Sequence, residues 1–143
     1  LDFIKNSKKL KKLTLEFASS YGNEIEFEDL NVLKNFTNLQ ELVLRNISTN
    51  VNISAISNCL KIKELTINFD SNWRDDKKLG DYLDSKLFEN CKNLELFDVT
   101  GIKQINLKAN ICDLNGLNGL NKLKTLKVGN FIIDGIDEKV FKN

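Results

Sequence analysis

The sequence has no histidine, no methionine and no proline, and only three cysteines among its 143 residues. Without histidine, Ser-His-Asp and Cys-His catalysis is excluded, and so are most zinc sites. The cysteines are Cys59, Cys91 and Cys112, and their odd number and wide spacing argue against a disulfide framework. Because the first residue is Leu1 and not methionine, we expect the sequence to be part of a longer chain.

An excess of charge of one sign is also missing. The chain has 21 basic and 20 acidic residues, so its net charge of +1 gives no global attraction to nucleic acid or to an anionic membrane. No apolar run approaches the roughly 18 residues of a transmembrane helix, and no signal peptide is visible. These features favour an intracellular, cytoplasmic protein, with a secreted or cell-surface location as the alternative.

Motifs for chemistry are absent as well. The sequence contains no glycine-rich phosphate loop and no nucleophile motif. We therefore expect a protein that is not an enzyme, needs no cofactor or metal, and has no small-molecule substrate. Another protein is the expected partner, with no nucleic acid and no membrane.

What the chain has in excess is leucine and isoleucine, with 22 and 13 residues, and these follow a repeat. The pattern L-x-x-L-x-L occurs five times, starting at residues 10, 39, 62, 94 and 123. Four residues before each start stands an asparagine, or a glycine in the fifth copy, and the starts are 23 to 32 residues apart. The residues at this position are Asn6, Asn35, Asn58, Asn90 and Gly119.

Each repeat combines two periodicities. The last two apolar positions are two residues apart, which is strand spacing, so Leu13 and Leu15 are expected to point inward and Thr14 outward. The three-residue spacing of apolar residues from Leu30 to Leu39 predicts a helical or 3₁₀ turn before the strand. One such unit cannot bury its apolar edge alone, so neighbouring units must stack.

Several polar and thiol positions have expected structural roles. Ser54 and Asp113 are predicted N-caps of the turns in their repeats. The recurring asparagine either ends each turn in a left-handed conformation or bonds a neighbouring backbone, and both alternatives stay open. Cys59 and Cys91 occupy equivalent repeat positions and are expected to be small buried hydrophobic residues.

The fivefold L-x-x-L-x-L pattern resembles the leucine-rich repeat family over essentially the whole chain. The resemblance implies an α/β solenoid with a parallel β-sheet on the concave face and short helices, 3₁₀ turns and loops on the convex face. It implies one domain over residues 1–143 with about five repeats. The expected strands lie near residues 10–17, 39–46, 62–69, 94–100 and 123–129.

Two subtypes of the family resemble parts of the sequence. The segment Phe88–Leu94 is similar to BspA-like repeats, while the Cys-x-x-Leu-x-x-Leu steps at Cys59 and Cys91 are similar to the cysteine-containing repeats found behind F-boxes. The residues at 139–143 match those at 86–90 position by position, so we expect a fragment of a longer array.

The outward strand positions form the expected partner-binding surface. Adjacent strands should bring Lys12 beside Glu41, Glu16 beside Arg45, and Asp98 beside Lys127. Trp73 and Arg74 join this surface because both residue types are enriched at interface hot spots. The full expected surface is Lys12, Thr14, Glu16, Glu41, Val43, Arg45, Glu64, Thr66, Asn68, Trp73, Arg74, Asp98 and Lys127.

The family resemblance and the missing catalytic motifs lead to one main functional hypothesis and two alternatives. The main one is a non-enzymatic protein–protein interaction scaffold that binds its partner on the concave strand face. The first alternative is the substrate-recognition part of an F-box-type ubiquitin-ligase adaptor. The second is a regulator of a GTPase or another enzyme, with Arg45 or Arg74 acting in trans.

Overall fold

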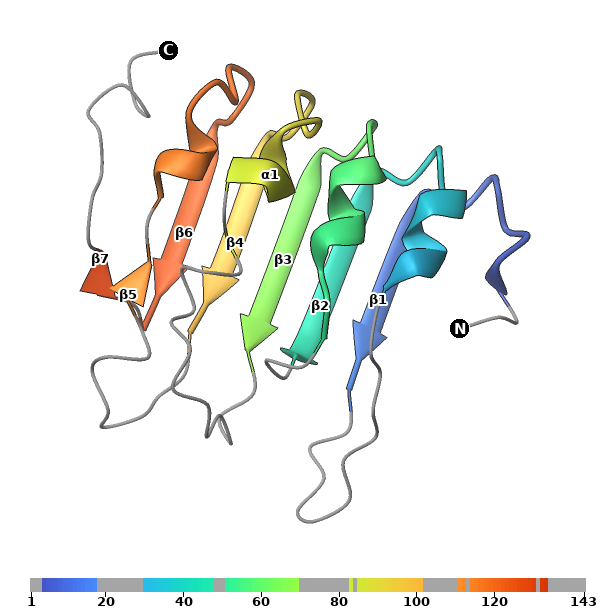
Figure 1. The fold of residues 1–143 in the computed structure, drawn as a ribbon, viewed down its shortest axis with the longest axis horizontal. Coiled ribbons are helices and arrows are strands. Elements are labelled where there is room, and N and C mark those ends of the chain that lie inside the picture. Colours follow the sequence, from blue (N-terminus) through green and yellow to red (C-terminus); the bar gives the residue numbers. More distant parts are fainter. Residues whose placement is uncertain are drawn as a thin grey trace.

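Five parallel strands form the main sheet of the computed structural model, which describes residues 4–17, 30–47, 51–69, 83, 85–101, 111–112, 114–130 and 132–133. The strands follow one another in the order β1, β2, β3, β4 and β6 (Figure 1). Their bounds are Lys12–Glu16, Glu41–Ile47, Glu64–Phe69, Leu96–Thr100 and Thr125–Gly129. The predicted parallel sheet is therefore confirmed.

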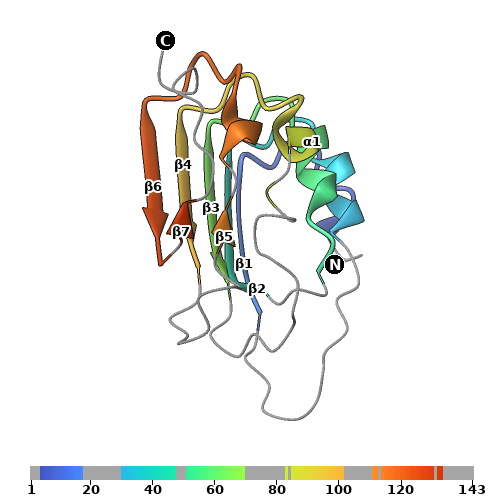
Figure 2. The ribbon, with the colours of Figure 1, turned by 60° about the vertical axis from the view of Figure 1, so that its left-hand side comes forward.

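A row of short helices packs on one face of this sheet. Figure 2 shows the helices on one side of the strands, and the described residues place no helix on the other side, which we call the open face. Neighbouring helices in the row contact one another. They are η2 (Asn31–Asn35), η3 (Ser54–Asn58), α1 (Ser85–Phe88) and η6 (Asn115–Leu117).

The three-residue apolar spacing produces these helices through a chain of tight turns. The N–H of Leu33 donates to the carbonyl of Leu30, that of Phe36 to Leu33, and that of Leu39 to Phe36, at 2.9 to 3.0 Å. The last of these turns recurs in all five repeats and ends at the first leucine or isoleucine of L-x-x-L-x-L. That residue therefore closes a turn, and each strand begins two residues later than the start of its predicted range.

The core lies between the sheet and the helix row. Leu42, Leu65 and Phe97 occupy one position of adjacent strands, and none of them is exposed to solvent. The ring of Phe88 in α1 meets the ring of Phe97 in β4 edge to face, with centroids 5.1 Å apart. Apolar residues from both layers thus interdigitate in a single core cluster.

A second, two-stranded parallel sheet was not predicted. It pairs β5 (Ile111–Cys112) with β7 (Ile132–Ile133), beside the lower end of β6 in Figure 1. Both strands consist of two apolar residues followed by aspartate in the sequence, at Asp113 and Asp134. A two-residue match is too short to be separated from a loop by periodicity, so only the pairing of neighbouring repeats reveals it.

The predictions for the residues that cap the short helices are only partly confirmed. The prediction of Ser54 as an N-cap is wrong, because the cap residue of η3 is Ile53. The backbone N–H of Ser54 donates a hydrogen bond to Oδ1 of Asn52. Asp113 lies outside the described residues. None of the described repeat asparagines has a positive φ, whereas Gly119 at the same repeat position does, with φ of +86°. Asn58 bonds backbone instead, donating from Nδ2 to the carbonyl of Ala55 at 3.2 Å.

Candidate functional site

The expected surface residues of the strands lie in rows across the open face. Strand pairing aligns Lys12, Glu41 and Glu64 in the first row, where Leu96 and Thr125 follow them. The same pairing forms a middle row of Thr14, Val43, Thr66, Asp98 and Lys127. Both rows have the register that the sequence repeat predicts, because equal spacing within each L-x-x-L-x-L keeps equivalent residues opposite each other.

The third row departs from that prediction. Arg45 aligns with Glu16 on β1, but the pairing of β2 with β3 shifts between Leu44 and Ile47, so Arg45 does not align with Asn68. Asn46 lies at this shift with a left-handed backbone, at φ of +56°. One extra residue on β2 is thus accommodated as a bulge. Asparagine tolerates the left-handed conformation at this bulge better than most residues.

Three ion pairs cross between neighbouring strands of the open face. Lys12 pairs with Glu41, the Lys127 Nζ lies 3.6 Å from an Asp98 oxygen, and the Arg45 Nη1 lies 4.0 Å from a Glu16 oxygen. These are the neighbours that the sequence predicted. The hydrogen bond to the Glu41 carboxylate and its charge raise the pKa of Lys12, which stays protonated at neutral pH.

The resulting open face is polar and carries both signs of charge. Val43 and Thr66 are half-buried in its middle, and Glu64 is exposed beside them. In the part of the chain that the structure describes, no group of three His, Cys, Asp or Glu side chains gathers where it could hold a metal ion. Trp73 and Arg74 lie outside the described residues.

Sequence reasoning missed a second set of polar residues, in the turns that lead into the strands. The residue before the first apolar position of the repeats alternates between two types, as Lys9, Asn38, Lys61, Asn93 and Lys122. The alternation is visible once the five repeats are aligned. Its meaning depends on which turns become neighbours, and that requires the stacked structure.

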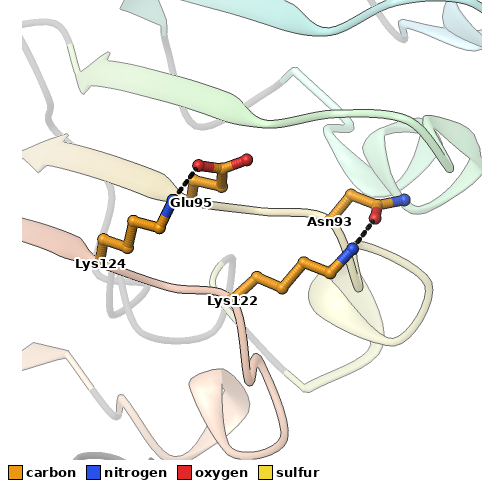
Figure 3. Close-up of polar contacts among 4 residues, drawn as sticks. All are labelled: Asn93, Glu95, Lys122 and Lys124. Carbon is orange, nitrogen blue, oxygen red and sulfur yellow. Dashed lines mark hydrogen bonds and ion pairs between the residues drawn. The ribbon is translucent and has the colours of Figure 1, made fainter.

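In the structure, each of these asparagines links three consecutive repeats. The Nδ2 of Asn93 donates to the carbonyl of Leu60 at 3.0 Å, and its Oδ1 accepts from the Lys122 Nζ at 2.7 Å (Figure 3). Asn38 makes the same two contacts, to the Lys8 carbonyl at 2.9 Å and from the Lys61 Nζ at 2.7 Å. We call these contacts the asparagine–lysine ladder.

A salt bridge runs beside the ladder, one position before the strands begin. The Lys124 Nζ lies 2.7 Å from an oxygen of Glu95 (Figure 3). The hydrogen bond from Lys124 and its positive charge, with a smaller effect of Lys63, lower the pKa of Glu95. Both effects favour the ionised form of Glu95.

The two cysteines of the described core are buried, as expected for small hydrophobic residues. Burial raises the pKa of the Cys59 thiol to about 12 and that of Cys91 to about 11. The Cys91 Sγ contacts the carbonyl of Leu87 at 3.6 Å and lies 3.9 Å from that of Ile56. Protonated, enclosed thiols are poor nucleophiles, so these residues serve packing.

Comparison with known proteins finds similar solved structures, one of which is an internalin. No protein-family model matches the chain, and no curated protein sequence matches it. A crystal structure of an internalin from Listeria monocytogenes is 22% identical and superposes with a TM-score of 0.47 over 93% of this chain. The chain spans 38% of the length of that internalin structure. Among the described residues, no helix is long and apolar enough to cross a membrane.

Proposed function

We propose that the chain is a leucine-rich repeat solenoid that acts as a non-enzymatic scaffold and binds a partner protein through the open face of its sheet. The observation that carries this proposal is the contrast between the two faces of the strands. Leu42, Leu65 and Phe97 turn inward and are fully buried, while the intervening residues turn outward and remain accessible to solvent. The proposal is made at the level of the family, and neither subtype is part of it.

The chemistry of the open face supports a protein partner. It carries both signs of charge, with opposite charges paired across strands at Lys12 with Glu41 and at Asp98 with Lys127, while Glu41 is also aligned with Glu64. A surface of mixed sign can match the mixed charges of a folded protein, and it offers no continuous positive stripe for a phosphate backbone.

The decisive test uses matched charge reversals on the two sides of the molecule. Glu64→Lys reverses one exposed charge in the first row of the open face, and Glu89→Lys reverses one exposed charge beside α1. A photo-crosslinking residue at Thr66 of the whole protein would first capture the partner from an extract of the source cells. Affinity of the purified partner would then be measured for each variant by isothermal titration calorimetry.

We expect Glu64→Lys to weaken binding about tenfold or more, which corresponds to about 1.4 kcal/mol. Glu89→Lys should leave the affinity within about twofold. Equal effects of the two variants, or a greater effect of Glu89→Lys, would place the partner elsewhere and overturn the proposal. Circular dichroism spectra of both variants would check that they fold as the parent does.

A further inference from the structure

The positive charge of the described chain is concentrated at one edge, where the helices and turns lead into the strands. The helices, turns and first strand residues of the five repeats contain twelve lysines and four glutamates. The remaining parts of the strands carry Glu16, Arg45, Asp98 and Lys127, which balance one another. The near-zero net charge of the sequence therefore conceals a strongly basic edge in the described structure.

The basic edge has an alternating composition. Three repeats, the first, third and fifth, have lysine on both sides of the first apolar residue of L-x-x-L-x-L, while the second and fourth have Asn-Leu-Gln and Asn-Leu-Glu there. Strands lie about 4.8 Å apart, so equivalent lysines two repeats apart are about 10 Å from each other. We call the three lysine pairs the basic rim: Lys9 and Lys11, Lys61 and Lys63, and Lys122 and Lys124.

The asparagine–lysine ladder orients part of this rim without neutralising it. Asn38 and Asn93 accept hydrogen bonds from Lys61 and Lys122, but a neutral amide leaves the ammonium charge intact. All six lysines of the rim are exposed. Glu95, which pairs with Lys124 and also interacts with Lys63 and Lys122, is the one acid among the residues that flank the first apolar position in the five repeats. The rim is therefore an array of solvent-exposed cations, of which Lys61, Lys122 and Lys124 are oriented by hydrogen bonds.

The surroundings of the rim discriminate between classes of anionic partner. Leu60 is 57% exposed and directly precedes Lys61, and it is the only strongly exposed large apolar residue in the described part of the chain. No aromatic side chain is exposed among the described residues, so a platform for stacking nucleotide bases is missing there. An apolar contact amid lysines fits a peptide with both acidic and apolar side chains.

We propose that the basic rim binds an extended acidic segment of a partner protein, with an apolar side chain of that segment resting on Leu60. The outer lysine pairs are about 20 Å apart, a distance that about six or seven extended residues span. The rim adjoins the first row of the open face but shares no residue with it, so the two proposals are tested with different residues and can fail independently.

The test measures binding of a fluorescein-labelled peptide of sequence Glu-Glu-Glu-Leu-Glu-Glu-Glu to the whole protein by fluorescence anisotropy. The rim variant Lys61→Gln/Lys63→Gln removes the central pair. The control variant Lys34→Gln/Lys86→Gln removes the same charge from exposed lysines of η2 and α1. We expect the rim variant to weaken binding at least tenfold and the control less than threefold, with affinity falling as salt increases.

The contribution of Leu60 is tested with a further variant and two peptides. Leu60→Ser should weaken binding of the leucine-containing peptide severalfold. The affinity for a peptide with glutamine in place of the central leucine should not change. Saturable peptide binding that the rim variant abolishes supports the proposal. No saturable binding at millimolar peptide, equal loss in the control variant, or tighter binding of a 20-nucleotide single-stranded RNA that is insensitive to Leu60→Ser would overturn it.

Discussion

The inner and outer strands of the sheet have the same sequence pattern but different burial. Leu42, Leu65 and Phe97 on the inner strands are inaccessible to solvent, whereas Leu13 on β1 and Leu126 on β6 are only partly buried at the same position. Each inner strand has a neighbour on both sides in the described sheet, and each outer strand has one. Burial therefore comes from the stack of repeats and not from the repeat itself.

The largest expected effect comes from truncating one leucine in each environment. Leu65→Ala leaves a cavity in the fully buried core, and we expect it to lower the free energy of unfolding by about 2–5 kcal/mol. Leu126→Ala at the equivalent position should cost roughly half as much, because solvent already reaches the side chain. Urea denaturation of both variants measures the difference, and equal costs would contradict the comparison.

The buried thiols of the inner repeats should make the free energy of unfolding depend on pH. Two of the three inner repeats have cysteine at one repeat position, Cys59 and Cys91; the other inner repeat has Phe36 there, and the outer repeats have Ser7 and Leu120. Because burial raises the folded-state pKa values to about 12 and about 11, the unfolded chain ionises first, near pH 8.5. The protonated thiols make their full contribution to the free energy of unfolding below about pH 8.5. This contribution is lost as the pH rises, by about 1 kcal/mol per thiol at pH 9.5.

The double variant Cys59→Ala/Cys91→Ala isolates this contribution. Its baseline stability will be lower because two side chains are shortened, so the informative quantity is the slope of the unfolding free energy between pH 8 and pH 10. We expect a shallower fall in the variant than in the parent. Parallel slopes in urea titrations would show that these thiols ionise equally in both states.

The asparagine–lysine ladder predicts a smaller effect that is shared by inner and outer repeats. Asn93→Ala removes the bond to the Leu60 carbonyl and the acceptor of Lys122, which should cost roughly 1 kcal/mol. Asn121→Ala changes an exposed asparagine in the turn of the fifth repeat and serves as the matched control, with little expected change. Similar thermal shifts for the two variants would argue against a stabilising ladder.

The smallest expected effect concerns one backbone position. Gly119 has φ of +86°, and a Cβ there would meet only the Lys92 Nζ at 3.8 Å, so Gly119→Ala introduces backbone strain without a steric clash. We expect a loss of about 0.5–1 kcal/mol. Asn90→Ala, at the same repeat position but with negative φ, should change stability less. The comparison can be made by thermal unfolding, and a neutral Gly119→Ala would contradict it.

Much of the fold could be predicted because the repeat contains two clear periodicities. The two-residue spacing of Leu13 and Leu15 indicated a strand, and the three-residue spacing up to Leu39 indicated a 3₁₀ turn, which the hydrogen bonds confirm. The pattern predicts strand starts that are two residues too early, because an apolar residue that closes a turn has the same sequence signature as one that begins a strand. Ser54 was misassigned for a related reason, since a polar residue inside the first turn resembles a cap.

The candidate surfaces were predictable to different degrees. The ion pairs of the open face followed from equal spacing within the repeats, which fixes which residues become neighbours. The sequence pattern does not predict the bulge at Asn46, because a single left-handed residue leaves the spacing of the apolar residues unchanged. The partners of Asn38 and Asn93 also required the structure, because they lie 23 to 33 residues away in the chain.

Which residues turn inward and which turn outward can be read from the amino-acid pattern, because side-chain direction along a strand has a period of two. The pattern also determines the register of most strand pairs through the constant spacing of each repeat. How deeply each leucine is buried and which turn residues contact one another follow from the stacking of the repeats. Those properties depend on the number of neighbouring repeats and on their spacing of about 4.8 Å, and no single repeat contains that information.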